Sequence, residues 1–258
     1  MAERKVAVIT GAGTGVGAAC AEWFAQRGWD ILVNYRASSA AAELVAEACR
    51  ALGADAVAVQ GDVASDTDCR HLAAQAGERW GRIDALINNA GTTKFAPMSD
   101  LEALGADDFL AIYAVNVVGA YQMARAALPL MPPGSAIVNI SSVAGNNGTG
   151  SCYAYAASKG ALNTLTLSLA RNLAPAIRVN AVLPGLIEGR WVREGVGDAA
   201  YDTVRANYAG SAALGTVATP ADVAATAGWL ATDAALMTGQ FVIVDAGLLL
   251  GKPPQILK

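Results

Sequence analysis

Three residues that could transfer a proton lie close together in the middle of the chain. Tyr155 and Lys159 are four residues apart, and Ser142 precedes the tyrosine by thirteen. If residues 153–172 form a helix, the tyrosine and the lysine share one face and reach the same pocket. An ammonium about 4 Å from a phenolate is worth about 4 kcal/mol at an effective dielectric of roughly 20. That interaction would bring the phenol pKa from ~10 towards ~7. The spacing therefore predicts a tyrosine that acts as an acid or base near neutral pH, while Ser142 orients the reacting oxygen.

The beginning of the chain has a pattern typical of dinucleotide binding. Residues 5–10 form a short apolar run rich in β-branched side chains, which predicts a buried strand. Alternate glycines follow at once, at Gly11, Gly13, Gly15 and Gly17. The next segment predicts a helix that stops near Gly28. A strand, a glycine turn and a helix present backbone N–H groups to a pyrophosphate, and side chains in the turn would block the phosphates. The alternative is a purely structural turn. A Walker-type phosphate loop is excluded because no Gly-Lys-Ser/Thr follows the turn.

The distribution of apolar residues predicts a single α/β domain over residues 1–258. Continuous apolar runs predict strands near 5–9, 31–34, 56–60, 84–88, 135–140, 176–182 and 240–244. Periodic segments between them predict helices near 15–27, 39–52, 66–80, 107–128, 154–172 and 221–231. Strands of this kind are covered on both faces, which favours a Rossmann-like, doubly wound parallel sheet of about seven strands with helices on both faces.

Polar residues and glycines follow the predicted strands at the points where the strands end. Ligands of a doubly wound sheet bind beyond the carboxyl ends of its strands. The residues found just past predicted strand ends are Gly11, Arg36, Asp62, Asn89, Ser142 and Pro184. We therefore expect these residues to surround a single cleft.

Several short motifs occur together in one order along the chain. They are Thr-Gly-x-x-x-Gly-x-Gly at 10–17, Asn88-Asn89-Ala90-Gly91, Asn116, Ser142, Tyr155, Lys159 and Pro184-Gly185. This combination closely resembles the short-chain dehydrogenase/reductase (SDR) family, in its single-domain branch, from residue 5 to about residue 251. The resemblance implies an NAD(P)(H)-dependent oxidoreductase, an alcohol dehydrogenase or ketoreductase that interconverts a carbonyl and a secondary alcohol by hydride transfer.

The resemblance also implies a role for each matching residue. Tyr155 would be the catalytic acid/base, and Ser142 would position the substrate oxygen. Lys159 would lower the tyrosine pKa and hold the nicotinamide ribose, and Asn116 would support a proton relay through a water molecule. The implied cofactor contacts are Gly11, Gly13, Thr14, Gly15, Val16, Gly17, Asp62, Val63, Asn89, Ala90, Gly91, Ile140, Tyr155, Lys159, Pro184, Gly185 and Ile187. One departure is Gly189, which stands where the family often has a threonine near the cofactor. It leaves that contact and the position of the following loop open.

The residues after the second predicted strand favour NADP(H) over NAD(H). A dinucleotide fold that prefers NAD usually carries an acid about 20 residues after the glycines. Residues 33–39 contain no acid, whereas Arg36 could pair with the 2′-phosphate of NADP and Ser38 could add a hydroxyl. The alternative is that Arg36 is a solvated loop residue, so NAD(H) stays possible. Thr14 weakens the NADP interpretation slightly, because many NADP-using relatives have a basic residue there.

Composition excludes several other classes of protein. The net charge of −4 offers no basic stripe for nucleic acid, and no apolar run approaches the ~20 residues of a membrane span. The first residues lead directly into a strand, so we expect no signal peptide. Four cysteines without close-pair spacing (Cys20, Cys49, Cys69 and Cys152) favour reduced thiols in a cytoplasmic protein over a metal site. His71 is the only histidine and falls in a predicted surface helix, which disfavours a histidine-based hydrolase triad.

The segment 186–219 predicts a substrate-binding lid within the domain, with a short helix near 198–208. Apolar lid residues such as Trp191 could contact a medium-sized carbonyl or alcohol, although most of them would simply pack the lid onto the body. The resemblance implies a homotetramer or homodimer, because relatives pair the helices at 107–128 and 154–172 across a two-fold axis and many also add the last strand. Both segments carry many small residues here, and the apolar residues of 241–245 and 248–250 look like such a contact. Ordinary core packing of the last strand is the alternative.

Two other functions stay open at this level. A non-catalytic dinucleotide-binding regulator keeps the same fold but has no need of the proton-transfer residues. Epimerisation or dehydration of a nucleotide sugar is less favoured, because such enzymes usually carry a larger C-terminal substrate domain. The sequence does not specify the substrate, the favoured direction or the stereochemistry.

Overall fold

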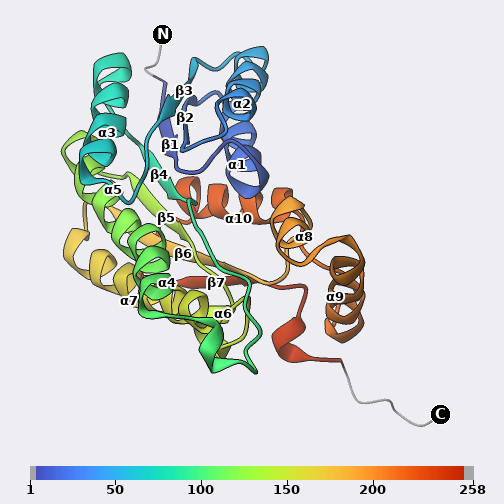
Figure 1. Ribbon diagram of the computed structural model, residues 1–258. Coiled ribbons are helices and arrows are strands. Elements are labelled where there is room, and N and C mark those ends of the chain that lie inside the picture. The colour runs from blue at the N-terminus through green and yellow to red at the C-terminus, as the bar shows by residue number, and fades with distance from the viewer. Residues whose placement is uncertain (1–3, 253–258) are drawn as a thin grey trace.

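The computed structural model describes residues 4–252, which fold around a parallel sheet of seven strands (Figure 1). The strand order is β3-β2-β1-β4-β5-β6-β7, so the chain builds outward from β1 in one direction and then in the other. The strands are β1 Val6–Ile9, β2 Asp30–Tyr35, β3 Ala56–Gln60, β4 Ala85–Asn88, β5 Ala136–Ile140, β6 Arg178–Pro184 and β7 Phe241–Val244. All predicted strands are confirmed, and each observed end lies within two residues of its prediction.

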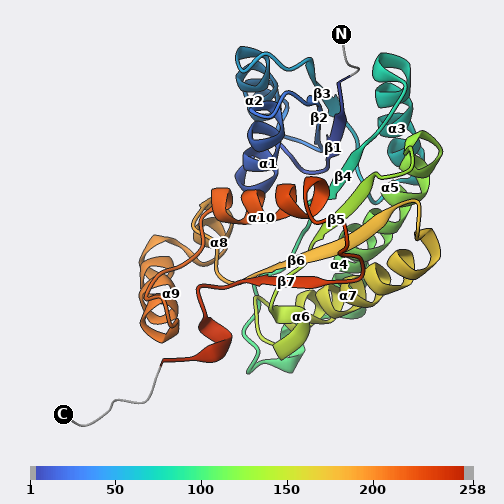
Figure 2. The same ribbon diagram turned by 180° about the vertical axis from the view of Figure 1, so that it is seen from behind.

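Helices cover both faces of the sheet, as the continuous apolar strands predict (Figures 1 and 2). One face carries α1 Gly15–Ala25, α2 Ser39–Ala51 and α10 Pro220–Thr232, and the other carries α3 Asp66–Trp80, α5 Ala120–Ala127 and α7 Tyr153–Leu173. Successive residues of one strand enter different cores. Val8 packs in the core under α3 and α5, whereas Ile9 packs in the core under α1 and α10. Burial on both faces explains why these strands are apolar throughout.

The helix predicted over 107–128 is interrupted. It divides into α4 Ala106–Tyr113, a π-helical turn at Ala114–Gly119 and α5. The turn packs closely on the end of β3, since a Cβ at Gly119 would lie 2.7 Å from Val63 Cγ2. A π-turn inserts one residue into a helix and often marks a functional site. In this protein the turn contains Asn116.

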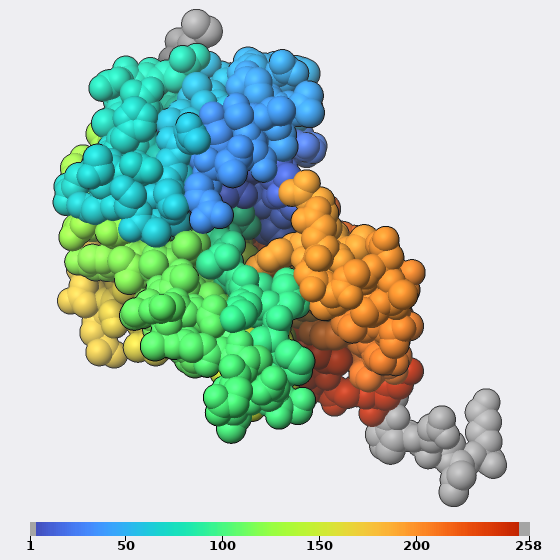
Figure 3. Space-filling view, viewed as in Figure 1, coloured from blue at the N-terminus to red at the C-terminus, as the bar shows by residue number. Residues whose placement is uncertain are grey.

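Short elements gather beyond the carboxyl ends of the strands. α6 Ala144–Asn147 follows β5, and α8 Arg190–Val196 and α9 Asp198–Ser211 follow β6. The helix predicted near 198–208 is confirmed as α9, whereas α6 and α8 lack a sequence signal that we recognised. In the space-filling view, deep-blue N-terminal residues lie recessed between light-blue, green and orange segments (Figure 3). This hollow lies where the strand order reverses, between β1 and β4, the usual ligand position in such sheets.

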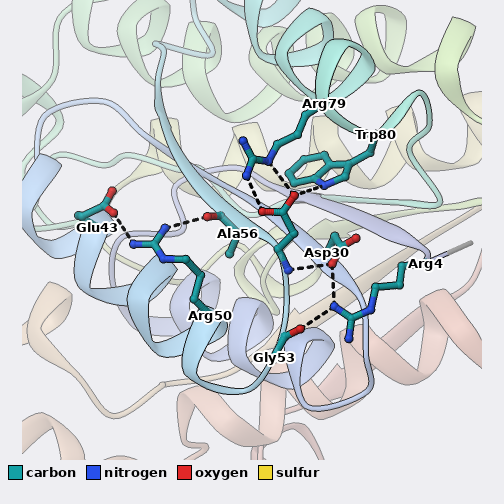
Figure 4. Close-up of polar contacts among 9 residues, drawn as sticks. Arg4, Asp30, Glu43, Arg50, Gly53, Ala56, Arg79 and Trp80 are labelled. Atoms are coloured by element: carbon teal, nitrogen blue, oxygen red, sulfur yellow. Dashed lines mark hydrogen bonds and ion pairs between the residues drawn. The ribbon is translucent and has the colours of Figure 1, made fainter.

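Hydrogen bonds and ion pairs of charged residues connect the amino ends of β2 and β3, at the end of the sheet opposite the hollow (Figure 4). Asp30 accepts hydrogen bonds from Arg4 at 3.2 Å and from the backbone N–H of Asp55 at 2.8 Å. The Asp55 carboxylate in turn accepts from Arg79 Nε at 2.8 Å and from the Trp80 indole N–H at 2.9 Å. The Arg79 guanidinium lowers the pKa of the Asp55 carboxyl. These bonds secure the outer strands far from the hollow.

Candidate active site

Tyr155 lies in the first turn of α7 and is directed into the protein. The Cys152 sulfur caps this helix by accepting the Tyr155 backbone N–H at 3.4 Å. Tyr153, in the same turn, is directed elsewhere, because its hydroxyl donates to the Met98 carbonyl at 2.6 Å. Of the two tyrosines in this turn, only Tyr155 therefore shares a site with Lys159 and Ser142.

Ser142 meets Tyr155 because two helices approach unusually closely. The Ser142 hydroxyl accepts the Ala144 backbone N–H at 3.1 Å and lies close enough to the Tyr155 phenol to lower its pKa. Just after it, Gly145 of α6 lies against the α7 backbone, where a Cβ would come 2.6 Å from the Lys159 carbonyl carbon. Only glycine permits this approach, so Gly145 brings the segment after β5 to the start of α7.

Lys159 is buried one helical turn beyond Tyr155, with 4% of its surface exposed. Its ammonium donates to the Ile140 carbonyl at 2.8 Å and lies 5.6 Å from the centroid of the Tyr155 ring. The shared face expected for positions 155 and 159 is thus observed. Ile140, which the family resemblance places among the cofactor contacts, holds the lysine through its backbone oxygen.

The electrostatics of the pair differ from the sequence-based expectation. Burial raises the pKa of Tyr155 to about 12, against the smaller lowering effect of the neighbouring Ser142 hydroxyl. Burial also lowers the pKa of Lys159 to about 8. The expected fall of the phenol pKa towards ~7 is therefore not produced by the protein groups alone. The physical reason is that desolvation outweighs attraction, while the ammonium is held at the Ile140 carbonyl.

Asn116 occupies the π-turn beside the lysine. Its side chain accepts the Thr92 N–H at 2.8 Å and donates to the Thr92 carbonyl and to the Ser158 hydroxyl, each at 3.0 Å. A Cβ at Gly91 would lie 3.5 Å from Asn116 Oδ1 and 3.8 Å from Lys159 Nζ. The backbone of Gly91 therefore lies between the Asn116 amide and the Lys159 ammonium, where no side chain intervenes. The four predicted catalytic residues thus lie together.

The glycine turn between β1 and α1 is tightly constrained at some positions and open at others. Gly11 and Gly15 have φ angles of +60° and +58°, which strongly favour glycine. A Cβ at Gly17 would lie 2.5 Å from Asn89 Nδ2 and 2.6 Å from the Gly11 oxygen. A Cβ at Gly15 would meet no atom within 4 Å, so the turn leaves open space above it. The Thr14 side chain does not cap α1.

Two asparagines hold the glycine turn in place. The Asn89 side chain donates to the Thr10 and Gly11 carbonyls at 2.9 and 3.0 Å. Buried Asn34 accepts the Gly11 N–H at 3.1 Å and donates to the Gly61 carbonyl at 2.9 Å. Asn34 therefore ties the turn to the ends of β2 and β3. Our sequence reasoning missed Asn34, although a polar residue inside the apolar run of β2 was the available signal.

The predicted adenosine side of the site also comes together. Arg36 follows β2 and is exposed, and its guanidinium lies 3.8 Å from the Asp62 carboxylate, which follows β3. Ser38 is exposed at the start of α2, where its side chain makes no capping hydrogen bond. Val63 is instead buried, and its carbonyl accepts the Gln122 side-chain N–H at 2.9 Å.

The end of β6 forms the opposite border of the site. The Pro184 carbonyl accepts the Val143 N–H at 3.0 Å, which holds this strand beside the Ser142 segment. A Cβ at Gly185 would lie 2.5 Å from the Tyr208 hydroxyl, so this position needs glycine. Ile187 pairs with Ala218 in an isolated parallel bridge, which closes the base of segment 186–219.

Comparisons with known proteins agree with this geometry. A family model described as enoyl-(acyl carrier protein) reductase matches residues 11–249. The chain belongs to the short-chain dehydrogenase/reductase family. An SDR crystal structure from Burkholderia xenovorans is 45% identical, covers 97% of this chain and 100% of its own, and superposes with a TM-score of 0.89. The chain is also 33% identical to the 3-oxoacyl-[acyl-carrier-protein] reductase of Staphylococcus aureus, over 95% of this chain and 98% of that protein. It is 36% identical to the versicolorin reductase of Emericella nidulans, over 94% of this chain and 95% of that protein.

As an SDR protein, the chain has an unusual backbone at the position where the family often has threonine. Gly189 has φ +152° and ψ −178°, a conformation that is essentially restricted to glycine. The helix α8 begins at the next residue. The departure seen in the sequence therefore has a structural counterpart, because threonine would be strained in this conformation.

In this SDR chain, segment 186–219, called the cap segment below, touches the predicted catalytic residues. Trp191 of α8 lies edge-to-face against Tyr155, with ring centroids 5.9 Å apart and planes at 72°. Four residues later, Gly195 lies against the Phe95 ring, where a Cβ would come 2.0 Å from Phe95 Cε2. Phe95 was not identified from the sequence, because nothing in the loop after β4 indicates a contact with residue 195.

Two further findings concern metals and membranes. Among residues 4–252, no group of three or more histidine, cysteine, aspartate or glutamate side chains could hold a metal ion. No helix in the described part of the chain is long and apolar enough to span a bilayer.

Proposed function

We propose that this protein is an NADP(H)-preferring ketoreductase in which Tyr155 exchanges a proton with the substrate oxygen. The single observation that carries the proposal is the meeting of three groups at one enclosed point. The Ser142 hydroxyl lies close enough to the Tyr155 phenol to lower its pKa, and the Lys159 ammonium lies 5.6 Å from the centroid of the Tyr155 ring. A protein that only binds a dinucleotide has no need of this arrangement.

The residues around the glycine turn fit a nicotinamide dinucleotide. Every second residue of the turn from Gly11 to Gly17 lacks a side chain, Gly15 borders open space, and α1 begins without a side-chain cap. These are the features that a pyrophosphate requires at a helix N-terminus. We assign the pyrophosphate to Gly11, Gly13, Thr14, Gly15, Val16 and Gly17. The remaining contacts would come from Asp62, Val63, Asn89, Ala90, Gly91, Ile140, Tyr155, Lys159, Pro184, Gly185 and Ile187. When bound, the nicotinamide supplies or accepts the hydride.

The preference for NADP(H) is supported by Arg36 and Ser38. Both side chains are exposed beside the end of β2, and the only carboxylate paired with Arg36 among the described ion pairs is Asp62, at 3.8 Å. A guanidinium at that position can make charge-assisted bonds to a 2′-phosphate. Because Arg36 and Asp62 lie 3.8 Å apart at the surface, their interaction is weak and opposes pairing of Arg36 with a 2′-phosphate only slightly.

The protein groups divide the work of carbonyl reduction as follows. Tyr155 donates its proton to the substrate oxygen as negative charge develops there, and the Ser142 hydroxyl stabilises the same oxygen. Lys159 supplies positive charge behind the phenol, which favours loss of the phenolic proton. Asn116 holds the Thr92 backbone and Ser158 next to the lysine, where a proton relay can begin.

The test is consumption of NADPH and of NADH with a panel of ketones and aldehydes, for the wild type and for Tyr155→Phe. We expect turnover with at least one carbonyl, a higher kcat/KM with NADPH, and a loss of at least 10²-fold in the variant. Retained cofactor binding in the variant would show that its loss is chemical. Full turnover by Tyr155→Phe would refute the role of the phenol. Cofactor binding without turnover on any carbonyl would support the regulator instead.

We also propose a cytoplasmic homodimer or homotetramer. Large apolar side chains are exposed along α4, the π-turn, α5 and α7, namely Leu110, Val118, Tyr121 and Leu167. Such a patch is typical of subunit contacts. The four cysteines are free and buried, which is compatible with a reducing compartment. Light scattering after gel filtration measures the assembly, and Leu110→Glu should shift it towards the monomer.

A further inference from the structure

One face of α8 is turned towards the candidate active site. Trp191 and Gly195 are four residues apart and therefore share this face. Gly195 packs against the Phe95 ring. The Trp191 and Tyr155 rings pack edge-to-face, with their centroids 5.9 Å apart. Two aromatic rings from separate parts of the chain thus contact this face or its neighbour, Trp191 against the reacting phenol and Phe95 against Gly195.

Trp191 does not serve as the anchor of the cap segment. Its side chain is 49% exposed, whereas Tyr201 of α9 is only 2% exposed. The Arg193 guanidinium lies 4.2 Å from the centroid of the Tyr201 ring and pairs with Asp198 at 2.8 Å. These contacts hold α8 and α9 together without Trp191. About half of the Trp191 surface therefore stays exposed while its ring contacts Tyr155.

The charges near these rings are paired. On the body side, Lys94, next to Phe95 in the chain, pairs with Asp108 at 2.8 Å. On the cap segment, Arg193 pairs with Asp198, and Arg205 pairs with Glu188. A substrate that is itself uncharged would leave these pairs intact, and the surface it meets is aromatic. An anionic substrate would have to compete with the carboxylates.

We propose that Trp191 is a specificity-determining residue that packs against a flat aromatic substituent next to the reacting carbonyl. The protein would then prefer uncharged aryl ketones to saturated ketones of the same size. This inference rests on the proposed ketoreductase function and assigns the substrate class. Ring pairs gain more than their buried area alone provides, and a planar ring can stack where a puckered saturated ring cannot.

The experiment compares acetophenone with cyclohexyl methyl ketone, which differ only in the aromaticity of the ring. We expect the wild type to have the higher kcat/KM for acetophenone. Trp191→Leu should lower that value by about tenfold, mainly through KM, and should change the value for the saturated ketone less than twofold. Trp191→Phe should restore most of the preference. Val204→Ala, at a residue of α9 that is 39% exposed, is the matched control and should leave both values unchanged.

The same comparison can be made without turnover. Calorimetry measures the affinity of both ketones for the NADPH complex of Tyr155→Phe, with and without the additional Trp191→Leu substitution. The ratio of affinities therefore tests Trp191 even if neither ketone is turned over, which separates this inference from the proposed function. If Trp191→Leu lowered kcat/KM equally for both ketones, or left the ratio of their affinities unchanged, the role of Trp191 would be overturned. Turnover of other carbonyls with such a result would leave the ketoreductase proposal standing.

Discussion

Replacing Lys159 by methionine should change how the stability of the protein depends on pH. The side chain is 4% exposed, and burial lowers its pKa from 10.5 to about 8. Since the folded pKa lies below the unfolded one, the unfolded chain binds more protons between about pH 8 and pH 10.5. Stability therefore rises with pH in that window, and the penalty for burying the ammonium is fully present only below pH 8.

The size of the effect follows from these two pKa values. At pH 7 the buried ammonium costs about 3 kcal/mol relative to the neutral amine, and at pH 10 the cost is below about 1 kcal/mol. Relative to Lys159→Met, the wild type should thus gain roughly 2–3 kcal/mol of unfolding free energy between pH 7 and pH 10. Methionine leaves the Ile140 carbonyl without its 2.8 Å donor. That cost does not depend on pH. It therefore adds a constant offset between the two curves of unfolding free energy against pH and leaves the change in their difference between pH 7 and pH 10 unaltered.

Urea unfolding of both proteins at half-unit pH intervals, at one protein concentration, measures this divergence. Tyr155→Phe is the matched control, because it removes the phenol and keeps the buried ammonium. It should follow the wild type up to about pH 9, below the range in which an ordinary tyrosine ionises. Parallel curves for the wild type and Lys159→Met from pH 7 to pH 10 would show that the ammonium is not desolvated. The electrostatic account of the site would then be wrong.

Three other substitutions test the cofactor side and the cap segment. Arg36→Ala should lower kcat/KM for NADPH by about 10- to 100-fold and leave the NADH value nearly unchanged, and equal losses with both cofactors would contradict the assignment. Gly17→Ala should lower Tm and weaken cofactor binding, at a cost of about 1–3 kcal/mol, because its Cβ would come 2.5 Å from Asn89 Nδ2. Gly13→Ala is the control for Tm alone, since its nearest contact would be an ordinary 3.5 Å from Ala42. Gly189→Thr should cost about 1–3 kcal/mol in chemical denaturation, because φ is +152° there; no loss would show that the cap segment adopts another backbone path.

The fold was predictable because its signals are local. Continuous apolar runs identified all strands, and the glycines and periodic segments between them placed most helices. The exceptions are physical as well. The π-turn at Ala114–Gly119 depends on close packing of Gly119 against Val63, and α8 depends on the glycine-only conformation of Gly189. Neither contact can be inferred from the periodicity of side chains.

The site was predictable as a set of residues but not as an electrostatic environment. Spacing on one helix places Tyr155 and Lys159 on a common face, and the family motifs add Ser142 and Asn116. The sequence cannot show how deeply these groups are buried, because Gly145 and Trp191 reach Lys159 and Tyr155 from separate segments. The sequence-based prediction therefore gave the attraction between Lys159 and Tyr155 too much weight and desolvation too little. Desolvation raises the Tyr155 pKa.

The cap segment and the protonation of the site should consequently be coupled. Burial is the largest cause of both pKa shifts, and Trp191 is the cap side chain that contacts the Tyr155 ring. A smaller residue at position 191 admits water, which stabilises the charged forms of both groups and moves both pKa values back towards their ordinary positions. Substitutions that change which ketone is accepted should therefore also move the pH profile of turnover. By the same reasoning, the conformation of Gly189 should affect the proposed chemistry at Tyr155 without any direct contact, because α8, which carries Trp191, begins at the next residue.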